Sequence, residues 1–357
     1  MISFAVVVIS LSLMLMNVVL SEWVITDTSG VYDYSGNPIL TPPDKHEWLL
    51  GDPTIISLGN EIHMFANEVF HGIIHLVANK ENPTEFTKVD GIVNLPGSVR
   101  PYAFISEPEN KLFLFYEQYE FPLYKSSKIL LRTASINIID GHASFDWQKE
   151  LTEILEPELD WEKIGTVRVG NPFVFYNNQK LQYWMYYSAS SVHLDDSNVD
   201  EPISIGLASS ASLYGPWTRI AQSPLLITGG TPDTINLGIG SLKLIKGLTG
   251  EDQDTNYTVL MALANRITLN TTNNVTGSTI SYMTSLDGGY SWSASIPNFI
   301  APSLSNPPTW KQAYCYGFDT IADPTDSSYV LAYYNGRNGW MHANESIGVS
   351  RIDKNLF

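Results

Sequence analysis

The chain has 357 residues, and its 20 lysines and arginines stand against 37 aspartates and glutamates, which gives a formal charge of −17. A surface this acidic repels phosphate groups, which argues against binding to nucleic acid or to an anionic membrane. Hydrophobic residues make up 44% of the chain, which excludes disorder, and a single cysteine excludes an internal disulfide framework and a cysteine-based zinc site. The composition predicts a soluble, folded protein that binds neutral or cationic ligands.

Residues 1–21 carry no charged side chain, and residues 4–20 are almost entirely apolar. Ser21 offers a small residue at a cleavage point before Glu22, so we interpret residues 1–21 as a secretory signal peptide. Residues 22–357 would then be the mature extracellular protein, with no membrane contact after cleavage. The alternative is a signal anchor, because the apolar run is about long enough to span a bilayer.

Four acceptor motifs for N-glycosylation support export and predict a glycoprotein. Their asparagines are Asn256, Asn270, Asn274 and Asn344. Three of the motifs fall within residues 256–276, which predicts an exposed loop region there.

Short runs rich in Val, Ile, Tyr, Phe and Trp fill the mature chain between Gly, Pro, Asn and Asp residues, and they predict β-strands. The runs recur in five groups of three. The first strands are expected over 51–56, 100–105, 170–175, 238–244 and 316–321. The second strands are expected over 61–66, 111–116, 180–187, 257–264 and 329–334. The third strands are expected over 73–78, 129–135, 203–209, 279–285 and 345–352.

This repeat predicts an all-β fold, a five-bladed β-propeller with one four-stranded blade per repeat. A two-sheet sandwich also contains many short strands, but it would not repeat the same group five times. Since no blade buries both of its faces alone, we expect residues 22–357 to form a single, monomeric domain.

Propeller geometry predicts where a site would lie. The first strand of each blade starts at one face of the central channel, and the antiparallel second strand returns to that face. Polar residues at these positions should converge in one funnel, and their mixture of carboxylates, guanidinium groups and amides suits an oligosaccharide or polysaccharide. They are Asp52, Glu68, His71, Arg100, Glu117, Glu120, Arg168, Asn171, Asn265, Arg266, Asp319, Asn335 and Arg337.

Three segments resemble a known family. Gly-Asp-Pro-Thr-Ile-Ile over 51–56, Gly-Asn-Pro-Phe-Val-Phe over 170–175, and the longer stretch 205–217 are similar to five-bladed glycoside hydrolases. These form the arabinanase, β-xylosidase and invertase superfamily, and the likeness is greatest to family 43. In that family an aspartate acts as general base, a second aspartate tunes it, and a glutamate is the general acid. The resemblance implies that Asp52 is the base and that Asn171 occupies the second position.

The family glutamate has no counterpart, because its segment aligns with 239–241, where no acidic residue occurs. Glycoside hydrolysis normally needs a protonated and an ionised carboxyl group on either side of the bond. Glu117 follows the most apolar strand, so we predict it as the general acid of a glycosidase. The remaining funnel residues predicted to bind substrate are Glu68, Arg100, Glu120, Arg168, Arg266 and Arg337.

Two other functions stay open. The missing glutamate favours a catalytically inactive propeller that binds glycans. A sialidase-like hydrolase is favoured by Ser-Leu-Asp-Gly-Gly-Tyr-Ser-Trp over 285–292, which matches a sialidase box, and by arginines that could bind an acidic sugar. The same box can equally serve only as a turn. No residue spacing predicts a metal site or a cofactor, although the converging acidic groups leave a channel calcium ion as an alternative.

Overall fold

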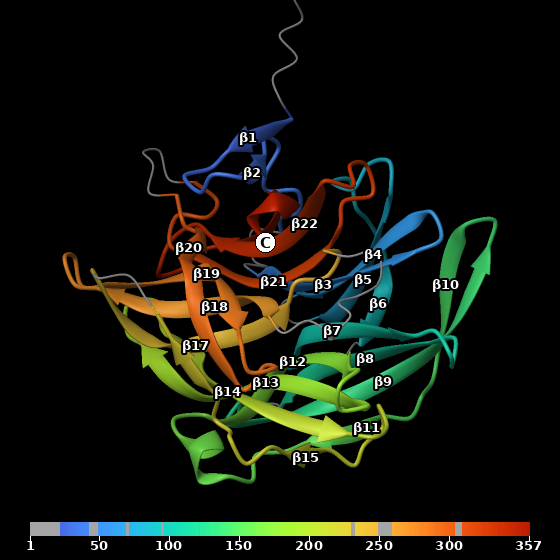
Figure 1. The fold of residues 1–357 in the computed structure, drawn as a ribbon, viewed down its shortest axis with the longest axis horizontal. Coiled ribbons are helices and arrows are strands. Elements are labelled where there is room, and N and C mark those ends of the chain that lie inside the picture. Colours follow the sequence, from blue (N-terminus) through green and yellow to red (C-terminus); the bar gives the residue numbers. More distant parts are fainter. Residues whose placement is uncertain are drawn as a thin grey trace, which may run out of the picture.

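The computed structural model describes residues 22–42, 49–68, 71–93, 96–120, 122–229, 233–248, 259–303 and 309–357. The predicted signal peptide and Asn256 lie outside these residues. Strands dominate the described structure (Figure 1), and its helical segments are two short 3-10 turns, η1 (Asp160–Lys163) and η2 (Lys354–Leu356). The all-β prediction is confirmed. Neither turn, the only helical structure in the described ranges, is long and apolar enough to cross a membrane.

Each predicted group of three strands corresponds to an antiparallel meander. The first strands are β3 (Leu50–Leu58), β7 (Ser98–Ser106), β12 (Val167–Asn177), β17 (Thr234–Leu244) and β21 (Tyr314–Ala322). The second strands are β4 (Glu61–Glu68), β8 (Lys111–Tyr119), β13 (Gln182–Leu194), β18 (Leu260–Asn270) and β22 (Tyr329–Arg337). The third strands are β5 (Gly72–Asn79), β9 (Ser126–Ile139), β14 (Val199–Ser210), β19 (Val275–Ser285) and β23 (Glu345–Asp353).

A further strand lies beside each third strand and completes the meander outward. These outer strands are β6 (Thr87–Val93), β10 (His142–Trp147) with β11 (Thr152–Leu155), β15 (Thr218–Arg219), β20 (Ser291–Ile300) and β2 (Val31–Tyr34). The last one comes from the start of the described chain, where β1 (Trp23–Ile25) pairs with β2 and β2 pairs with β23. The first and last parts of the described chain therefore share one sheet. The remaining short strand, β16 (Leu226–Thr228), runs parallel to β20.

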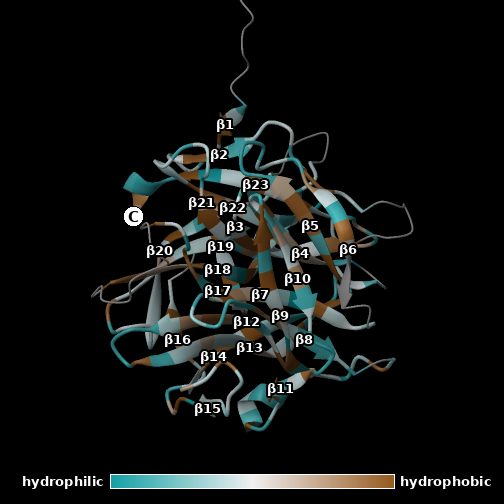
Figure 2. Ribbon diagram, turned by 90° about the vertical axis from the view of Figure 1, so that its right-hand side faces the viewer, coloured by the Kyte–Doolittle hydropathy of each residue, from teal (hydrophilic) through white to brown (hydrophobic). Residues whose placement is uncertain are grey.

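The first strands lie toward the middle of the molecule and the outer strands at its periphery (Figure 1). Hydrophobic residues follow the central strands, and hydrophilic residues are most frequent in the peripheral connections (Figure 2). The core between meanders is strongly aromatic, and its largest fully buried side chains include Trp184, Trp292, Tyr186 and Phe115. Large aromatic side chains bury much apolar area for each residue, which suits the narrow space between neighbouring sheets.

A β-bulge interrupts the pairing near the start of every first strand. In four of the five strands the bulged residue has a left-handed backbone, with φ of 48° at Asp52, 52° at Arg100, 44° at Asn171 and 43° at Gly317. A bulge turns the side chain of its residue out of the regular alternation of a strand. Proline follows three of these residues, which costs no ladder hydrogen bond because the pairing is already broken there.

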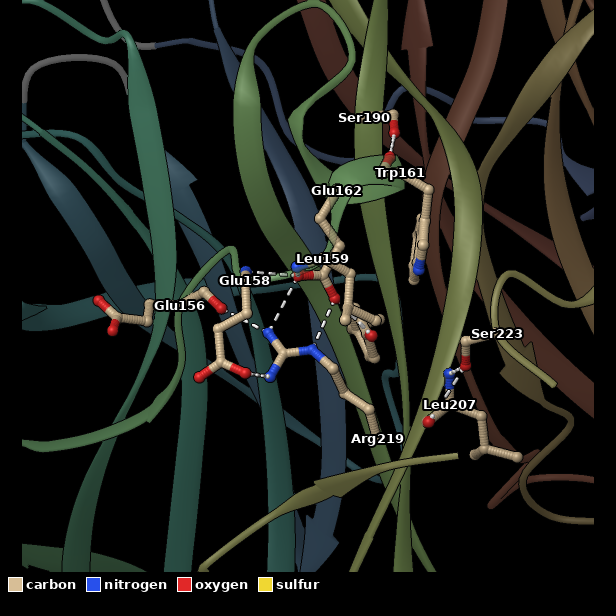
Figure 3. A network of polar contacts seen from close by, with 10 residues as sticks. Glu156, Glu158, Leu159, Trp161, Glu162, Ser190, Leu207, Arg219 and Ser223 are labelled. Carbon is tan, nitrogen blue, oxygen red and sulfur yellow. Dashed lines mark hydrogen bonds and ion pairs between the residues drawn. The ribbon is translucent and has the colours of Figure 1, made fainter. Parts of the chain in front are cut away.

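A buried polar network fixes the connection that leads into the third meander (Figure 3). Glu162, in η1, is fully buried and accepts hydrogen bonds from Arg219 Nε (2.7 Å) and Nη2 (3.0 Å). The Tyr187 hydroxyl donates to the same carboxylate at 2.8 Å, and the backbone N–H groups of Glu158 and Leu159 donate to it as well. One carboxylate thus holds together η1, β13 and β15.

Replacing Glu162 with alanine is expected to lower the free energy of unfolding by about 3 kcal/mol. The buried Tyr187 hydroxyl would lose its acceptor, and Arg219 would keep only Glu158 as an ion-pair partner among the described residues. Urea unfolding followed by tryptophan fluorescence measures the change. Glu150→Ala, at an exposed position, is the matched control and should change stability by less than about 0.5 kcal/mol. A Glu162→Ala protein as stable as the parent chain would show that the network does not support the fold.

Candidate functional site

One cavity lies where the five first strands meet. It is lined by Asp52, Arg100, Pro101, Asn171, Pro172, Ser241, Lys243 and Gly317. Each of β3, β7, β12, β17 and β21 contributes at least one of these residues. Three sequence-predicted residues, Asp52, Arg100 and Asn171, therefore face the same space, and each is a bulged residue with a left-handed backbone. The bulges explain this convergence, because they redirect one side chain from each strand.

Asp52 is held by one residue of its own meander and by one residue of a neighbouring meander. Its backbone N–H donates to Asn335 Oδ1 at 2.7 Å, from β22. The amide of Asn67, in β4, assigned with its nitrogen facing inward, donates to Asp52 Oδ2 at 2.7 Å and to the Gly51 carbonyl at 3.1 Å. Burial raises the pKa of Asp52 above its ordinary value, against the opposing charges of Arg100 and Lys243. The result is a firmly positioned carboxyl group with a weakened tendency to ionise.

Gly317 leaves the room that the Asp52 carboxyl group occupies. A β-carbon at Gly317 would overlap Asp52 Oδ1, and the φ of 43° at this position already disfavours a side chain. Glycine here therefore has a packing reason as well as a conformational one.

Glu117 has a different environment from the one predicted for a general acid. It is fully buried, and both of its oxygens accept from Arg168 Nη2 at 2.7 Å. Arg100 Nη1 (3.1 Å) and Ser127 Oγ (2.7 Å) also donate to it. Burial by itself raises the pKa of Glu117, but the two arginines outweigh it and leave the pKa below its ordinary value. An ionised carboxylate carries no proton to give, so these contacts suit a residue that positions Arg100 better than an acid.

Glu345, at the start of β23, has the properties that Glu117 lacks. Its side chain is buried and lies 4.0 Å from Arg337 Nη1, and the Tyr316 hydroxyl donates a hydrogen bond to it. Burial raises the pKa of Glu345 to about 7, and the negative charges of Asp52 and Glu201 add to this effect. A carboxyl group that titrates near neutral pH is what proton donation to a leaving group requires.

Glu201, at the start of β14, belongs to the same group of charges. Burial raises the pKa of Glu201, and the charge of Asp52 raises it further, while Arg100, Arg168 and Arg337 oppose the rise. The predicted funnel comprises first-strand starts and second-strand ends, so it includes neither Glu201 nor Glu345. The strand pattern nevertheless predicts their position, because the hairpin between second and third strands places the third-strand starts at the face where the second strands end.

Two predicted carboxylates lie apart from the cavity lining. Glu68 is buried at the end of β4 and forms an ion pair with Lys88 at 2.6 Å. Glu120 is exposed in the hairpin after β8 and accepts from Ser126 Oγ at 3.0 Å.

Of the four predicted arginines, Arg100 alone lines the cavity, and the buried Arg168 is bonded to Glu117. Arg266 is buried and donates to the backbone carbonyls of Thr228, at 3.3 Å, and Gly229. Arg337 donates to the Trp340 carbonyl at 2.8 Å and lies 4.0 Å from Glu345, which does not line the cavity either. The four arginines predicted from the sequence therefore do not form a single cluster in the cavity.

The sialidase-like box builds a turn. The Asp287 carboxylate accepts from the backbone N–H groups of Tyr290 (3.1 Å) and Ser291 (3.0 Å) between β19 and β20. Trp292 is buried, and its Nε1 donates to the Gly289 carbonyl at 3.2 Å. Each of these contacts is local, as expected for an Asp side chain that organises a tight turn.

Within the described ranges, no three His, Cys, Asp or Glu side chains are arranged to hold a metal ion.

The raised pKa of Glu345 predicts a pH dependence of stability. Between pH 4.5 and about 7 the folded chain binds this proton more tightly than the unfolded chain, so stability falls as the pH rises through this window. Glu345→Gln should remove up to about 3 kcal/mol of that fall. Unfolding in urea at pH 4.5, 6 and 8 measures the effect, with the exposed Glu120→Gln as control. Parallel pH profiles for Glu345→Gln and the parent chain would contradict the assignment.

No protein-family model and no curated protein sequence matches the chain. Solved structures do match it. The catalytic domain of a GH62 α-L-arabinofuranosidase from Coprinopsis cinerea has a TM-score of 0.57 at 12% identity, over 88% of this chain and 95% of that one. An α-L-arabinanase mutant from Cellvibrio cellulosa has a TM-score of 0.53 at 10% identity, over 85% and 91%.

A third match is named for a reaction other than glycoside hydrolysis. An N-acetylgalactosamine deacetylase from F. plautii, in complex with blood group B trisaccharide, has a TM-score of 0.58 at 9% identity, over 88% of this chain and 96% of that one. At such low identity these likenesses establish the fold and leave the reaction to be argued from the site. The chain has the fold of the β-propeller glycoside hydrolases, as its sequence motifs predicted.

Proposed function

We propose that residues 22–357 form a single, monomeric, five-bladed β-propeller with one four-stranded blade per repeat, which hydrolyses an oligosaccharide or polysaccharide in its central cavity. The architecture is supported by five meanders, by an outer strand beside each, and by a cavity lined from all five first strands. Pairing of β2 with β23 supplies the outer strand of the last meander.

The observations that carry the enzymatic proposal are the Asp52 carboxyl in the cavity lining and the buried carboxyl of Glu345 outside that lining. Burial raises the pKa of Glu345 to about 7, and the charge of Asp52 contributes to the rise. Glu345 donates its proton to the glycosidic oxygen as the bond from this oxygen to the anomeric carbon breaks. Asp52 accepts a proton from the water molecule whose oxygen bonds to the same carbon. The leaving group gains the proton of Glu345, and Asp52 gains one proton of the water. Asp52 then releases a proton to solvent and Glu345 takes one up, so each turnover consumes a single water molecule.

Three further residues support these two. The negative charge of Glu201 raises the pKa of Glu345, which is the tuning role that the resemblance assigns to the position of Asn171. Asn171 is neutral and donates to the Gly240 carbonyl at 2.8 Å, so it joins two first strands. Glu117 fixes Arg100, whose positive charge favours the ionised form of Asp52.

The second candidate is a catalytically inactive propeller that binds glycans. It is favoured because two acidic residues of the family have no counterpart here. Asn171 replaces the second aspartate, and the segment 239–241, which aligns with the glutamate, contains no carboxyl group. The two candidates differ in turnover rather than in ligand.

Asp52→Asn is expected to reduce kcat/KM by roughly 10²–10⁴ on the best substrate in a panel of chromogenic glycosides and plant or animal polysaccharides. Glu345→Gln should reduce polysaccharide hydrolysis by a similar factor. It should slow 4-nitrophenyl glycosides much less, because a 4-nitrophenolate leaves without a proton. Initial-rate kinetics at pH 5 to 8 measure both effects.

Glu120→Gln is the control for both variants, since this exposed side chain lies away from the cavity lining. Undiminished turnover by Asp52→Asn would remove Asp52 from the mechanism. Equal losses on both substrate types in Glu345→Gln would argue against proton donation by Glu345. A parent chain that binds a glycan but hydrolyses none of the panel would support the inactive propeller.

We also propose that the chain is secreted and carries N-glycans. Asn270 and Asn274 flank the hairpin turn between β18 and β19, and Asn344 is exposed just before β23. The prediction of a loop over 256–276 is wrong, since most of its described part lies in β18 and β19. Expression in a eukaryotic secretory host should give a chain that begins near Glu22, with added glycan mass that PNGase F removes. An uncleaved N-terminus retained with membranes would favour the signal anchor.

A further inference from the structure

Lys243 is a buried cation that forms no hydrogen bond and no close ion pair with the described residues of the cavity. Its side chain is 7% exposed, and it makes no hydrogen bond or ion pair with any residue that the structure describes. Its Nζ lies 5.9 Å from the ring centroid of Tyr102 and 5.7 Å from that of Phe318. These rings attract the ammonium weakly, and burying a charge is unfavourable unless it is paired. Asp319 and Asp52 attract the ammonium group from a distance, but no anion among the described residues is in hydrogen-bond contact with it.

The Ser241 hydroxyl is a second buried polar group beside Lys243 that lacks a hydrogen-bond partner. Its hydroxyl oxygen is buried without a hydrogen-bond partner within the described part of the chain. Ser241 and Lys243 are two residues apart on β17, beyond the bulge at Ile239 and Ser241, so their side chains point to the same face of the strand. Both line the cavity that contains Asp52. Buried polar atoms of this kind are normally satisfied by a ligand or by water.

The charge of the cavity lining has the opposite sign to that of the whole chain. Arg100 and Lys243 are the cationic residues of the lining and Asp52 is its anionic residue, which gives +2 − 1 = +1. The chain as a whole has a charge of −17. The side chain of Arg100 is 18% exposed, and Lys243 is the more buried of the two cations.

We propose that the sugar bound in this cavity is acidic, with its carboxylate against Lys243 Nζ and the Ser241 hydroxyl. This inference rests on the proposed function, because it places the sugar beside Asp52. A carboxylate accepts from the ammonium and from the hydroxyl together, so it satisfies both unpartnered groups. A neutral sugar would offer hydroxyl groups but would leave the buried charge unpaired. Uronic acids and sialic acids both carry such a carboxylate.

The test compares acidic and neutral sugars of matched shape. Isothermal titration with D-galacturonic acid against D-galactose, and with D-glucuronic acid against D-glucose, measures binding without requiring turnover. We expect at least tenfold tighter binding of one acid than of its neutral partner, and Lys243→Met should abolish this preference. Lys125→Met removes the same charge from an exposed position and should leave the preference unchanged.

Ser241→Ala provides a second variant that keeps the charge and should weaken acid binding severalfold. Circular dichroism confirms that the variants are folded. N-acetylneuraminic acid distinguishes a sialic acid from a uronic acid, and tight binding of either supports the proposal. Equal affinity for acid and neutral sugar, an unchanged preference in Lys243→Met, or displacement of the acid by acetate at equal concentration would each overturn it.

Failure of this proposal differs from failure of the proposed function. A chain that hydrolyses only neutral glycosides, with dependence on Asp52, retains the glycosidase and loses the acidic substrate. A chain that binds an acidic sugar through Lys243 but hydrolyses no glycoside retains the acidic ligand and loses the enzyme.

Discussion

The left-handed bulge near the start of the first strands is the constraint on which the site depends. A residue other than glycine in this conformation costs on the order of 1–3 kcal/mol, and Asp52, Arg100 and Asn171 all adopt it. Contacts across strands hold the conformation, such as Asp52 N–H to Asn335 and the Asn171 amide to the Gly240 carbonyl. Without the bulges, the regular alternation of each strand would turn these side chains into the space between sheets.

Buried charges around the cavity divide into paired and unpaired groups. Glu117 and Arg168 are both fully buried and bonded to each other, and this pair holds the more exposed Arg100. Glu345, Asp52 and Lys243 are buried or partly buried with incomplete compensation, and burial shifts each of their pKa values toward the neutral form. Groups shifted in this way concentrate at functional sites, whereas pairs such as Glu117 and Arg168 provide the rigid surroundings.

The strand pattern was predictable because it is local. Turn residues and short β-branched or aromatic runs marked each meander, and Asp52 was found from the Gly-Asp-Pro turn that opens β3. The bulge itself, and therefore the direction of the Asp52 side chain, had no distinct sequence signal. The predicted funnel does not include Glu345, since β23 is a third strand and the prediction rests on first and second strands. The sequence also does not show that Arg168 pairs with Glu117, which is why the predicted proton donor lies in an ion pair.

The sequence by itself determined the all-β character, the fivefold recurrence of strand groups and the place of Asp52, because each depends on residues close together in the chain. Only the tertiary structure decided which charged groups meet. Asp52, Lys243 and Glu345 are separated by roughly a hundred residues or more from one another, and their pKa values depend on burial and on neighbours from other meanders. The net charge of −17 likewise gave no sign of a cavity with a positive lining, because a sum over the chain contains no information about where its charges lie.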